Sequence, residues 1–211
     1  MRVRSDSSLI IDESRRVTIL GISGSLRSES YSTSILHALS DHAAPEINLI
    51  VKTLEDIPPY NQDLDTEPAI PAIAEFRTAV GNSDGLVLST PEYNHGIPGV
   101  LKNALDWGSR PAFTSCFVGK PVLIISSSPG LVGGVRAQYQ IRETLISMLE
   151  RVVPGSEIVI GDVRSKQANG KFVDERSLAH VAEGLRRLCQ EVAVYASVKR
   201  NDAAHTAAEQ S

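Results

Sequence analysis

The sequence predicts an α/β fold with a doubly wound, five-stranded parallel sheet in the order 2-1-3-4-5. Apolar runs that are typical of buried strands alternate along the chain with segments of helical periodicity. Loops rich in Gly, Ser, Pro or Asn follow the first, third and fourth of these runs. In this strand order those three loops meet at the carboxyl edge of the sheet, where open α/β sheets bind ligands.

The expected strands are short segments rich in Val, Ile and Leu, bounded by turn-forming residues. They cover residues 17–22, 47–51, 85–90, 121–126 and 158–160. The expected helices cover residues 32–40, 70–80, 100–107 and 135–151, and a last helix follows the apolar positions between Leu178 and Val192. Residues 15–200 are therefore expected to form one domain, with flexible tails over residues 1–14 and 201–211.

The composition is that of an ordinary globular protein, with 42% hydrophobic and 22% charged residues among 211. A net charge of −4 disfavours nucleic acid or an anionic membrane as the main partner. The apolar run at residues 9–11 is too short for a signal-peptide core, and no run is long enough to span a membrane. We therefore expect a cytoplasmic protein.

The two cysteines, Cys116 and Cys189, have neither a metal-ligand spacing nor the pattern of a disulfide framework. We expect them to be small buried hydrophobic residues rather than a redox pair. No metal site is predicted.

The loop after the first strand, residues 21–32, has the composition of a phosphate site. The unpaired N–H groups and the dipole of a helix N-terminus favour an anion. Serine hydroxyls add donors, and Arg27 adds a planar guanidinium that suits phosphate. The serines are Ser23, Ser25, Ser30 and Ser32. The loop therefore predicts a site for a phosphate monoester, with an N-capped Ser/Gly turn as the alternative.

The spelling of this loop excludes several other phosphate or catalytic motifs. It lacks GxxxxGK[ST], the signature of a nucleoside triphosphate loop. It also lacks GxGxxG, and the second strand ends at Lys52 rather than at an acid, so a dinucleotide site is disfavoured. Residues 21–25 miss the hydrolase pattern GxSxG by one position.

The loop after the third strand, residues 91–99, lies between a buried strand and a helix that begins near Pro98 and Gly99. Its backbone N–H groups, the Tyr93 ring and the Asn94 amide suit a flat heteroaromatic ligand. The alternatives are that Tyr93 is a core aromatic residue and that His95 lies on the surface. The loop after the fourth strand, residues 126–134, has glycines that let a backbone approach a ligand, and an ordinary strand–helix loop is the alternative.

Together the three loops resemble the NADPH-dependent FMN reductase family, a flavodoxin-like group that includes quinone, chromate and azo-compound reductases. The resemblance is carried by residues 24–30, residues 91–107 and the Gly133-Gly134 pair. It runs from about Val17 to Leu188 in the order that the family has. The segment 91–107 is the most specific of the three.

The resemblance implies that FMN is a bound cofactor and that NADPH or NADH is a substrate. It places the FMN phosphate on Ser25, Arg27, Ser30 and Ser32, the last of which is often Asn in relatives. Ser23 and Tyr31 belong to the same expected site. The ring would be bordered by Pro91, Glu92, Tyr93, Asn94, His95, Ser126, Ser128 and Gly133.

The sequence shows no Ser-His-Asp order and no well-placed catalytic acid, which agrees with an enzyme whose cofactor carries the chemistry. The hypothesis is a ping-pong cycle in which NAD(P)H donates hydride to the flavin, leaves, and a small acceptor then takes the electrons. Free flavin, quinone, chromate and azo compounds are all candidate acceptors. The rival classes are an FMN-binding electron carrier without NAD(P)H activity and a phosphate-binding or hydrolytic protein without flavin.

The family also implies a homodimer or homotetramer, for which the helix over residues 135–151 would be a natural contact. Within the family, Lys102 and Asn103 are expected to be helix or interface residues. Arg110, Arg136 and Arg142 could meet the extra phosphate of NADPH, and solvated surface charge is the alternative for each.

Overall fold

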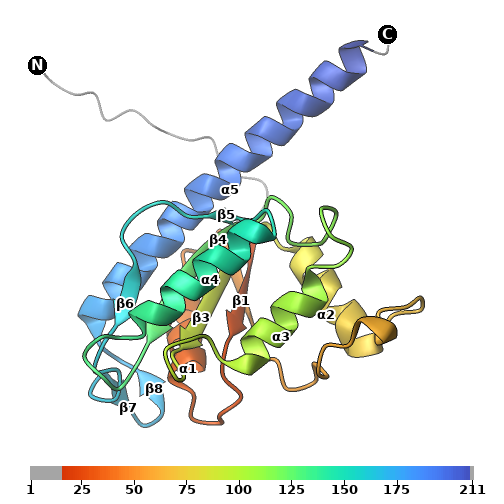
Figure 1. Ribbon diagram of the computed structural model, residues 1–211. Coiled ribbons are helices and arrows are strands. Elements are labelled where there is room, and N and C mark those ends of the chain that lie inside the picture. The colour runs from red at the N-terminus through yellow and green to blue at the C-terminus, as the bar shows by residue number, and fades with distance from the viewer. Residues whose placement is uncertain (1–15, 210–211) are drawn as a thin grey trace, which may run out of the picture.

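A parallel sheet in the order β2-β1-β3-β4-β5 forms the centre of the structure (Figure 1), a computed structural model that describes residues 16–209. Its main strands are β1 (Val17–Ser23), β2 (Ile47–Lys52), β3 (Gly85–Pro91) and β4 (Pro121–Ser127). Each is an apolar run paired in parallel with its neighbour. The predicted strand order is confirmed.

Two short segments share the fifth position of the sheet. β5 (Arg151–Val152) pairs with the beginning of β4, and β6 (Ile158–Ile160) pairs in parallel with its end. The prediction placed a single fifth strand at residues 158–160. The chain instead leaves the sheet between residues 152 and 158, so two partners cover the edge of β4.

Helices cover both faces of the sheet, and a separate hydrophobic cluster lies under each layer. α1 (Tyr31–Asp41) and α5 (Glu175–Glu209) pack on one face, where Ile35, Leu39 and Leu185 are buried. α2 (Pro71–Asn82), α3 (Gly99–Gly108) and α4 (Val135–Ser147) cover the other face. Successive strand residues alternate between the two clusters, as the pleat of a strand requires.

The helix predicted over residues 135–151 is shorter than expected, and its end is a correction. α4 ends at Ser147, and Leu149 has a positive φ of 63° that turns the chain out of the helical path. Arg151 then belongs to β5 rather than to the helix. The other predicted helices agree with the structure to within a few residues, except that α5 is much longer.

The last part of the chain holds two features that the sequence analysis did not anticipate. An antiparallel hairpin of β7 (Gln167–Ala168) and β8 (Lys171–Phe172) lies beside α1. α5 continues to Glu209 and projects beyond the sheet (Figure 1), so most of the predicted C-terminal tail is part of this helix. The predicted N-terminal tail, residues 1–14, lies outside the described residues.

No helix in the described part of the chain combines the length and the apolar composition that crossing a membrane requires.

Candidate functional site

A cavity of about 130 Å³ lies where the three predicted loops meet at the carboxyl edge of the sheet. The loops after β1, β3 and β4 each contribute to its wall. The lining residues are Ser25, Arg27, Ser30, Tyr31, Ser32, Pro91, Glu92, Tyr93, Ser127, Ser128 and Pro129. Segments about one hundred residues apart in the sequence therefore form one site, as the strand order predicts.

The N-terminus of α1 forms one wall of this cavity. Ser30 is the N-cap, and its Oγ accepts a hydrogen bond from the Thr33 backbone N–H at 3.2 Å. Because the Ser30 hydroxyl accepts in this bond, its hydrogen is free to donate to a ligand. Ser32 Oγ is buried and has no hydrogen-bond partner among the described residues. The wall therefore presents hydroxyl and backbone donors at the positive end of a helix dipole.

The loop that leads into α1 is braced by serine hydroxyls. Ser23 Oγ lies 2.8 Å from Thr33 Oγ1, and it accepts a long hydrogen bond of 3.4 Å from the Ser25 N–H. Ser25 Oγ in turn accepts a 3.4 Å hydrogen bond from the Arg27 N–H. Ser23 does not line the cavity, so its place in the predicted site is that of a support for the loop.

Arg27 reaches the cavity from beside the ring of Tyr31. The guanidinium carbon lies 5.6 Å from the centroid of that ring, within the range of a cation–π contact. Such a contact restricts a long side chain that would otherwise be mobile. Both residues line the cavity, so the cation stands beside the serine hydroxyls of the α1 wall.

The opposite wall ends in a tight turn over residues 93–96. The Tyr93 N–H donates to Gly96 O at 2.9 Å, and the Gly96 N–H donates to Tyr93 O at 3.0 Å. Asn94 and His95 have φ values of 50° and 68°, the conformation of a two-residue turn of type I′. The N–H groups of these two central residues are thus free of the hairpin's own hydrogen bonds.

The side chains of this turn lie mainly at the surface. Tyr93 lines the cavity but is 47% exposed, and neither Asn94 nor His95 lines it. The sequence analysis expected the backbone N–H groups of this loop to face a ring. Fewer of them are available than expected, because the N–H groups of Tyr93, Gly96 and Ile97 are already bonded within the protein.

Glu92 lines the cavity, but its carboxylate binds the N-terminus of α4. Oε2 accepts hydrogen bonds from the N–H groups of Arg136 at 2.9 Å and Ala137 at 3.2 Å. The Arg136 guanidinium lies 3.7 Å from the other carboxylate oxygen. The N-cap of α4 is Gly134, which has no side chain to cap with, so Glu92 supplies the cap from a separate loop.

The last two serines of β4, Ser126 and Ser127, point to opposite sides of the sheet, and Ser128 follows the strand. Ser126 lies on the α4 side, where its Oγ accepts a hydrogen bond from Gln138 Nε2 at 3.3 Å. Ser127 lies on the α1 side, lines the cavity, and its buried Oγ has no partner among the described residues. Ser128 and Pro129 continue this wall. Ser127 is thus a site residue that the sequence analysis missed, and the strand period of two could have found it.

The third loop also places Gly133 away from the cavity. A Cβ at Gly133 would lie 2.5 Å from a methyl group of Val159 and 2.8 Å from the Gly161 N. This glycine is therefore required by its packing against β6. Of the predicted site residues, Ser23, Asn94, His95, Ser126 and Gly133 do not line the cavity.

Two of the residues whose roles the sequence analysis left open, Asn103 and Lys102, have partners within the protein. Asn103 accepts a hydrogen bond from the Tyr60 N–H at 2.6 Å and donates to Pro58 O, so it anchors the long loop between β2 and α2. Lys102 pairs with Asp106 at 2.6 Å on the same helix. Arg110 lines a groove between α3 and α4, and the Arg142 Nε is buried without a partner among the described residues.

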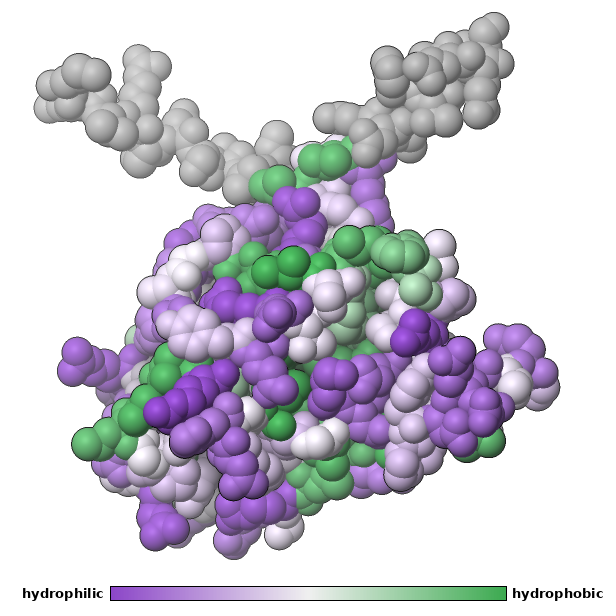
Figure 2. Space-filling view, viewed as in Figure 1, coloured by the Kyte–Doolittle hydropathy of each residue, from purple (hydrophilic) through white to green (hydrophobic). Residues whose placement is uncertain are grey.

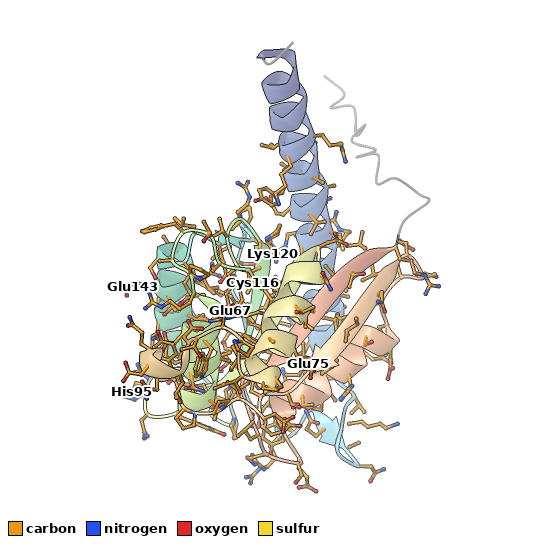
Figure 3. The ribbon with its side chains drawn as sticks, turned by 90° about the vertical axis from the view of Figure 1, so that its right-hand side faces the viewer. Glu67, Glu75, His95, Cys116, Lys120 and Glu143 are labelled. Atoms are coloured by element: carbon orange, nitrogen blue, oxygen red, sulfur yellow. The ribbon has the colours of Figure 1, made fainter. Side chains whose placement is uncertain are left out.

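The most strongly perturbed titratable groups lie away from this site. Figure 3 shows His95 at the loop end, and Cys116 and Lys120 closer to the end from which α5 projects. Burial raises the pKa of Cys116 and of Cys189 to about 11, and both thiols are free. Burial also raises the pKa of Glu150 well above its usual range. These groups are part of the packing and do not face the cavity.

The donor set of the cavity fits a phosphate monoester joined to a flat ring. The unpartnered Ser32 hydroxyl, the N-capping Ser30 hydroxyl and Arg27 lie at the N-terminus of α1, and the unpartnered Ser127 hydroxyl lines the cavity from β4. The other side offers the backbone of a proline-rich strand end and the Tyr93 ring. FMN has a terminal phosphate and a flat heteroaromatic ring, so the residues present fit this cofactor.

Comparison with known proteins agrees with this chemistry. The chain is 36% identical over 173 residues to an NAD(P)H-dependent FMN reductase of Pseudomonas aeruginosa, covering 82% of this chain and 93% of that protein. It is 37% identical over 153 residues to a quinone reductase of Pseudomonas putida, covering 72% and 82% of the two chains. The solved structure of FerB, a flavoenzyme NAD(P)H:(acceptor) oxidoreductase from Paracoccus denitrificans, has a TM-score of 0.74 at 27% identity and covers 85% of this chain and 98% of its own.

The model of the NADPH-dependent FMN reductase family matches residues 17–164, from the start of β1 to just before the β7–β8 hairpin. The match includes all three loops that line the cavity. The family and its relatives imply FMN as the cofactor and NAD(P)H as the electron donor. The family match over residues 17–164 and these relatives lead to one conclusion: the chain belongs to the NADPH-dependent FMN reductase family.

Proposed function

We propose that this protein holds FMN in the cavity between α1 and the 91–96 loop and uses NAD(P)H to reduce a small, flat acceptor of the quinone class. The observation that carries the proposal is the pair of buried hydroxyls, on Ser32 and Ser127, that have no partner among the described residues and line this cavity. Leaving such a group unsatisfied costs about 1–3 kcal/mol, which a bound ligand would recover.

The α1 wall would hold the phosphate. The residues proposed for it are Ser25, Arg27, Ser30 and Ser32, together with the first N–H groups of α1. Tyr31 contributes by holding Arg27 in place through its ring. The helix dipole and the guanidinium act together, because both favour negative charge at the same place.

The other two loops would enclose the ring. Pro91, the backbone of Glu92 and Tyr93 are proposed for one side, and Ser127 and Ser128 for the other. When bound, FMN supplies the redox chemistry, taking electrons from NAD(P)H and delivering them to an acceptor. The N–H groups of Asn94 and His95, which take no part in the hydrogen bonds of the turn, are the donors of this loop proposed to favour negative charge on the ring.

The acceptor is inferred from the relatives and from the openness of the turn. The Pseudomonas putida relative is a quinone reductase, and a quinone is a flat molecule. Tyr93 is half exposed, so a flat substrate can reach the ring wall from solvent. We propose that both substrates use this same face, so that NAD(P)H leaves before the acceptor enters and the kinetics are ping-pong.

The proposal is tested by the visible spectrum of the purified protein, before and after the addition of FMN, followed by anaerobic addition of NADPH and NADH. Flavin bands that bleach with either nucleotide and return when a benzoquinone is added are the expected result. No flavin bands after FMN addition would exclude the proposed cofactor site. Flavin bands that neither nucleotide bleaches would favour the non-enzymatic electron carrier instead.

A second copy of the chain is the proposed occupant of the groove between α3 and α4. This groove has a volume of about 480 Å³ and includes the apolar side chains of Phe113, Met148 and Leu149. On α4 itself, Tyr139 and Ile146 are 64% and 65% exposed. Figure 2 shows this face, with hydrophobic surface gathered over the upper end of α4. A group of exposed apolar side chains on one face is typical of a protein–protein interface.

Light scattering tests this homo-oligomer. Ile146→Glu is expected to lower the molar mass to that of one chain, because it places a charge in the proposed contact. Ile50→Glu is the matched control, since Ile50 is 48% exposed on the edge strand β2. A wild-type protein of 22.7 kDa in solution would contradict the proposal.

We also infer a cytoplasmic location. The described structure has both cysteines as free thiols, which agrees with a reducing compartment. Cell fractionation with antibody detection tests this location.

A further inference from the structure

The turn over residues 93–96 is attached to the body of the protein mainly through α4. Its own hydrogen bonds join only Tyr93 and Gly96 to each other. Its central residues, Asn94 and His95, have positive φ values, which a type I′ turn requires and which Asn adopts readily. These bonds fix the shape of the turn, but its position relative to the rest of the protein depends on contacts outside it.

Gln140 makes the closest of these contacts. Its Oε1 accepts a hydrogen bond from the Ile97 backbone N–H at 2.7 Å, just after the turn. The same oxygen lies 2.6 Å from the place that a Cβ on Gly96 would occupy. The amide of Gln140 thus rests directly on the backbone of the turn, and the absence of a side chain at Gly96 permits this approach.

A second attachment lies just before the turn. The Glu92 carboxylate accepts hydrogen bonds from the first N–H groups of α4, as described above. The two attachments come from one helix, one turn of it apart, and they bracket the residues 93–96. The position of the turn is thereby tied to the position of α4.

Gln140 does not line the cavity. It lies instead at the groove between α3 and α4, on the other side of the turn. Any effect it has on a ligand in the cavity must pass through the backbone of residues 93–97.

We propose that Gln140 is a positioning residue for the cofactor: its amide oxygen fixes the 93–96 turn against α4 and so sets how the turn meets the flavin ring. The inference rests on the proposed function, because it takes this turn as part of the ring wall. Loss of the amide oxygen frees the Ile97 N–H and lets the turn move, which weakens FMN binding and changes the reduction potential of the bound cofactor.

The test compares Gln140→Leu, which removes the acceptor at similar size, with Gln140→Glu, which keeps an oxygen acceptor in the same place. In the FMN-free protein, the backbone exchange rate of Ile97 is measured by hydrogen–deuterium exchange NMR. Gln140→Leu is expected to raise this rate about tenfold, and Gln140→Glu to restore it. Glu143→Gln, on the same helix and in the same groove but exposed, is the matched control and should leave the rate unchanged.

The same variants are then titrated with FMN, and the midpoint potential of the loaded protein is measured. Gln140→Leu is expected to weaken FMN binding about tenfold and to shift the potential, while Gln140→Glu retains most of the wild-type affinity. Gly96→Ala should reproduce the effects of Gln140→Leu, because the new methyl group displaces the amide. The double variant with Gln140→Leu and Gly96→Ala should bind FMN only slightly more weakly than either single variant.

An unchanged Ile97 exchange rate in Gln140→Leu would overturn the inference, since the turn would not depend on the amide. Faster exchange with unchanged FMN affinity and potential would also overturn it, because the turn would then have no bearing on the cofactor. If the wild-type protein binds no FMN, the proposed function fails. The exchange rates are measured without FMN, so they test the contact between Gln140 and the turn independently of that result.

Discussion

The guanidinium of Arg27 lies 5.6 Å from the centroid of the Tyr31 ring, and both side chains line the cavity at the start of α1. Tyr31 is the first residue of α1, whose N-terminus forms the wall proposed for the phosphate. The charge and the helix dipole therefore lie on the same element.

Arg27→Ala is expected to weaken FMN binding by about 10- to 150-fold, the loss of about 1.5–3 kcal/mol from charged hydrogen bonds. The measurement is flavin fluorescence titration with both FMN and riboflavin. Riboflavin lacks the phosphate, so its affinity should be unaffected by the change. Equal losses for the two flavins would show that Arg27 acts on something other than the phosphate.

Ser32→Ala is expected to lower FMN affinity by about tenfold while leaving the stability of the FMN-free protein nearly unchanged. The reason is that the Ser32 hydroxyl has no partner to lose among the described residues. Ser23→Ala is the matched comparison, because the Ser23 hydroxyl is bonded within the loop and its loss should lower the free energy of unfolding. Urea unfolding and FMN titration are measured for both variants. Equal losses of stability and of FMN affinity in the two variants would contradict the prediction.

Glu92→Gln is expected to lower the free energy of unfolding by about 0.3–1 kcal/mol, because it removes a negative charge from the N-terminus of α4 but keeps an acceptor. Glu92→Ala should cost about 1–2 kcal/mol, since the α4 N–H groups then lose their cap. Urea unfolding at low and high salt separates the two effects. Only the Gln variant's deficit should shrink toward zero with salt, and a salt-independent deficit would argue against the dipole contribution.

Glu150→Gln is expected to make the protein more stable at neutral and alkaline pH. Burial raises the pKa of Glu150 in the folded state, and its carboxylate oxygens have no partner among the described residues. As the pH rises above the ordinary value of 4.5, the unfolded chain releases this proton while the folded protein keeps it, so stability falls until the folded group also ionises. The free energy of unfolding of the wild-type protein therefore decreases between the pKa of Glu150 in the unfolded chain and its higher pKa in the folded protein. The Gln variant has no such group and does not show this decrease.

Thermal unfolding of both proteins from pH 4 to pH 9 checks the Glu150 prediction. The two curves should lie close together near pH 4 and separate as the pH increases. Parallel curves over the whole range would mean that Glu150 ionises with an ordinary pKa.

Both cysteines are expected to be unreactive in the folded protein. With pKa values of about 11, only about one thiol in a thousand is ionised at pH 8, and both side chains are largely buried. Ellman's reagent should detect no fast-reacting thiol before unfolding and two after it. A fast-reacting thiol in the native protein would contradict the assignment of Cys116 as packing.

The sequence was most informative where a long apolar run ends in a turn. β1, β3 and β4 extend only one residue beyond the ranges predicted for them, because runs such as residues 85–90 are buried on both faces and cannot be mistaken for surface segments. The same runs fix which loops share an edge, so Ser25, Arg27 and Tyr93 could be assigned to one site before any contact was known.

Other features depend on contacts that no local pattern reveals. α4 stops at Ser147 because Leu149 takes a left-handed conformation, and leucine gives no warning of this. Glu92 lies in the site loop, yet its carboxylate caps a helix 44 residues away. The β7–β8 hairpin, in contrast, has the Asn169-Gly170 pair at its turn, and that dipeptide would have predicted it.

The cap on α4 has a consequence for which anions this sheet edge can accept. Two helices next to the cavity, α1 and α4, present positive ends there, but α4 already carries a carboxylate from its own chain. Only the N-terminus of α1 is left to attract an anion from a ligand, so this edge offers one helix-end anion site instead of two. If the FMN phosphate occupies that site as proposed, the phosphates of NAD(P)H meet no second helix N-terminus there, and a single glutamate makes this difference.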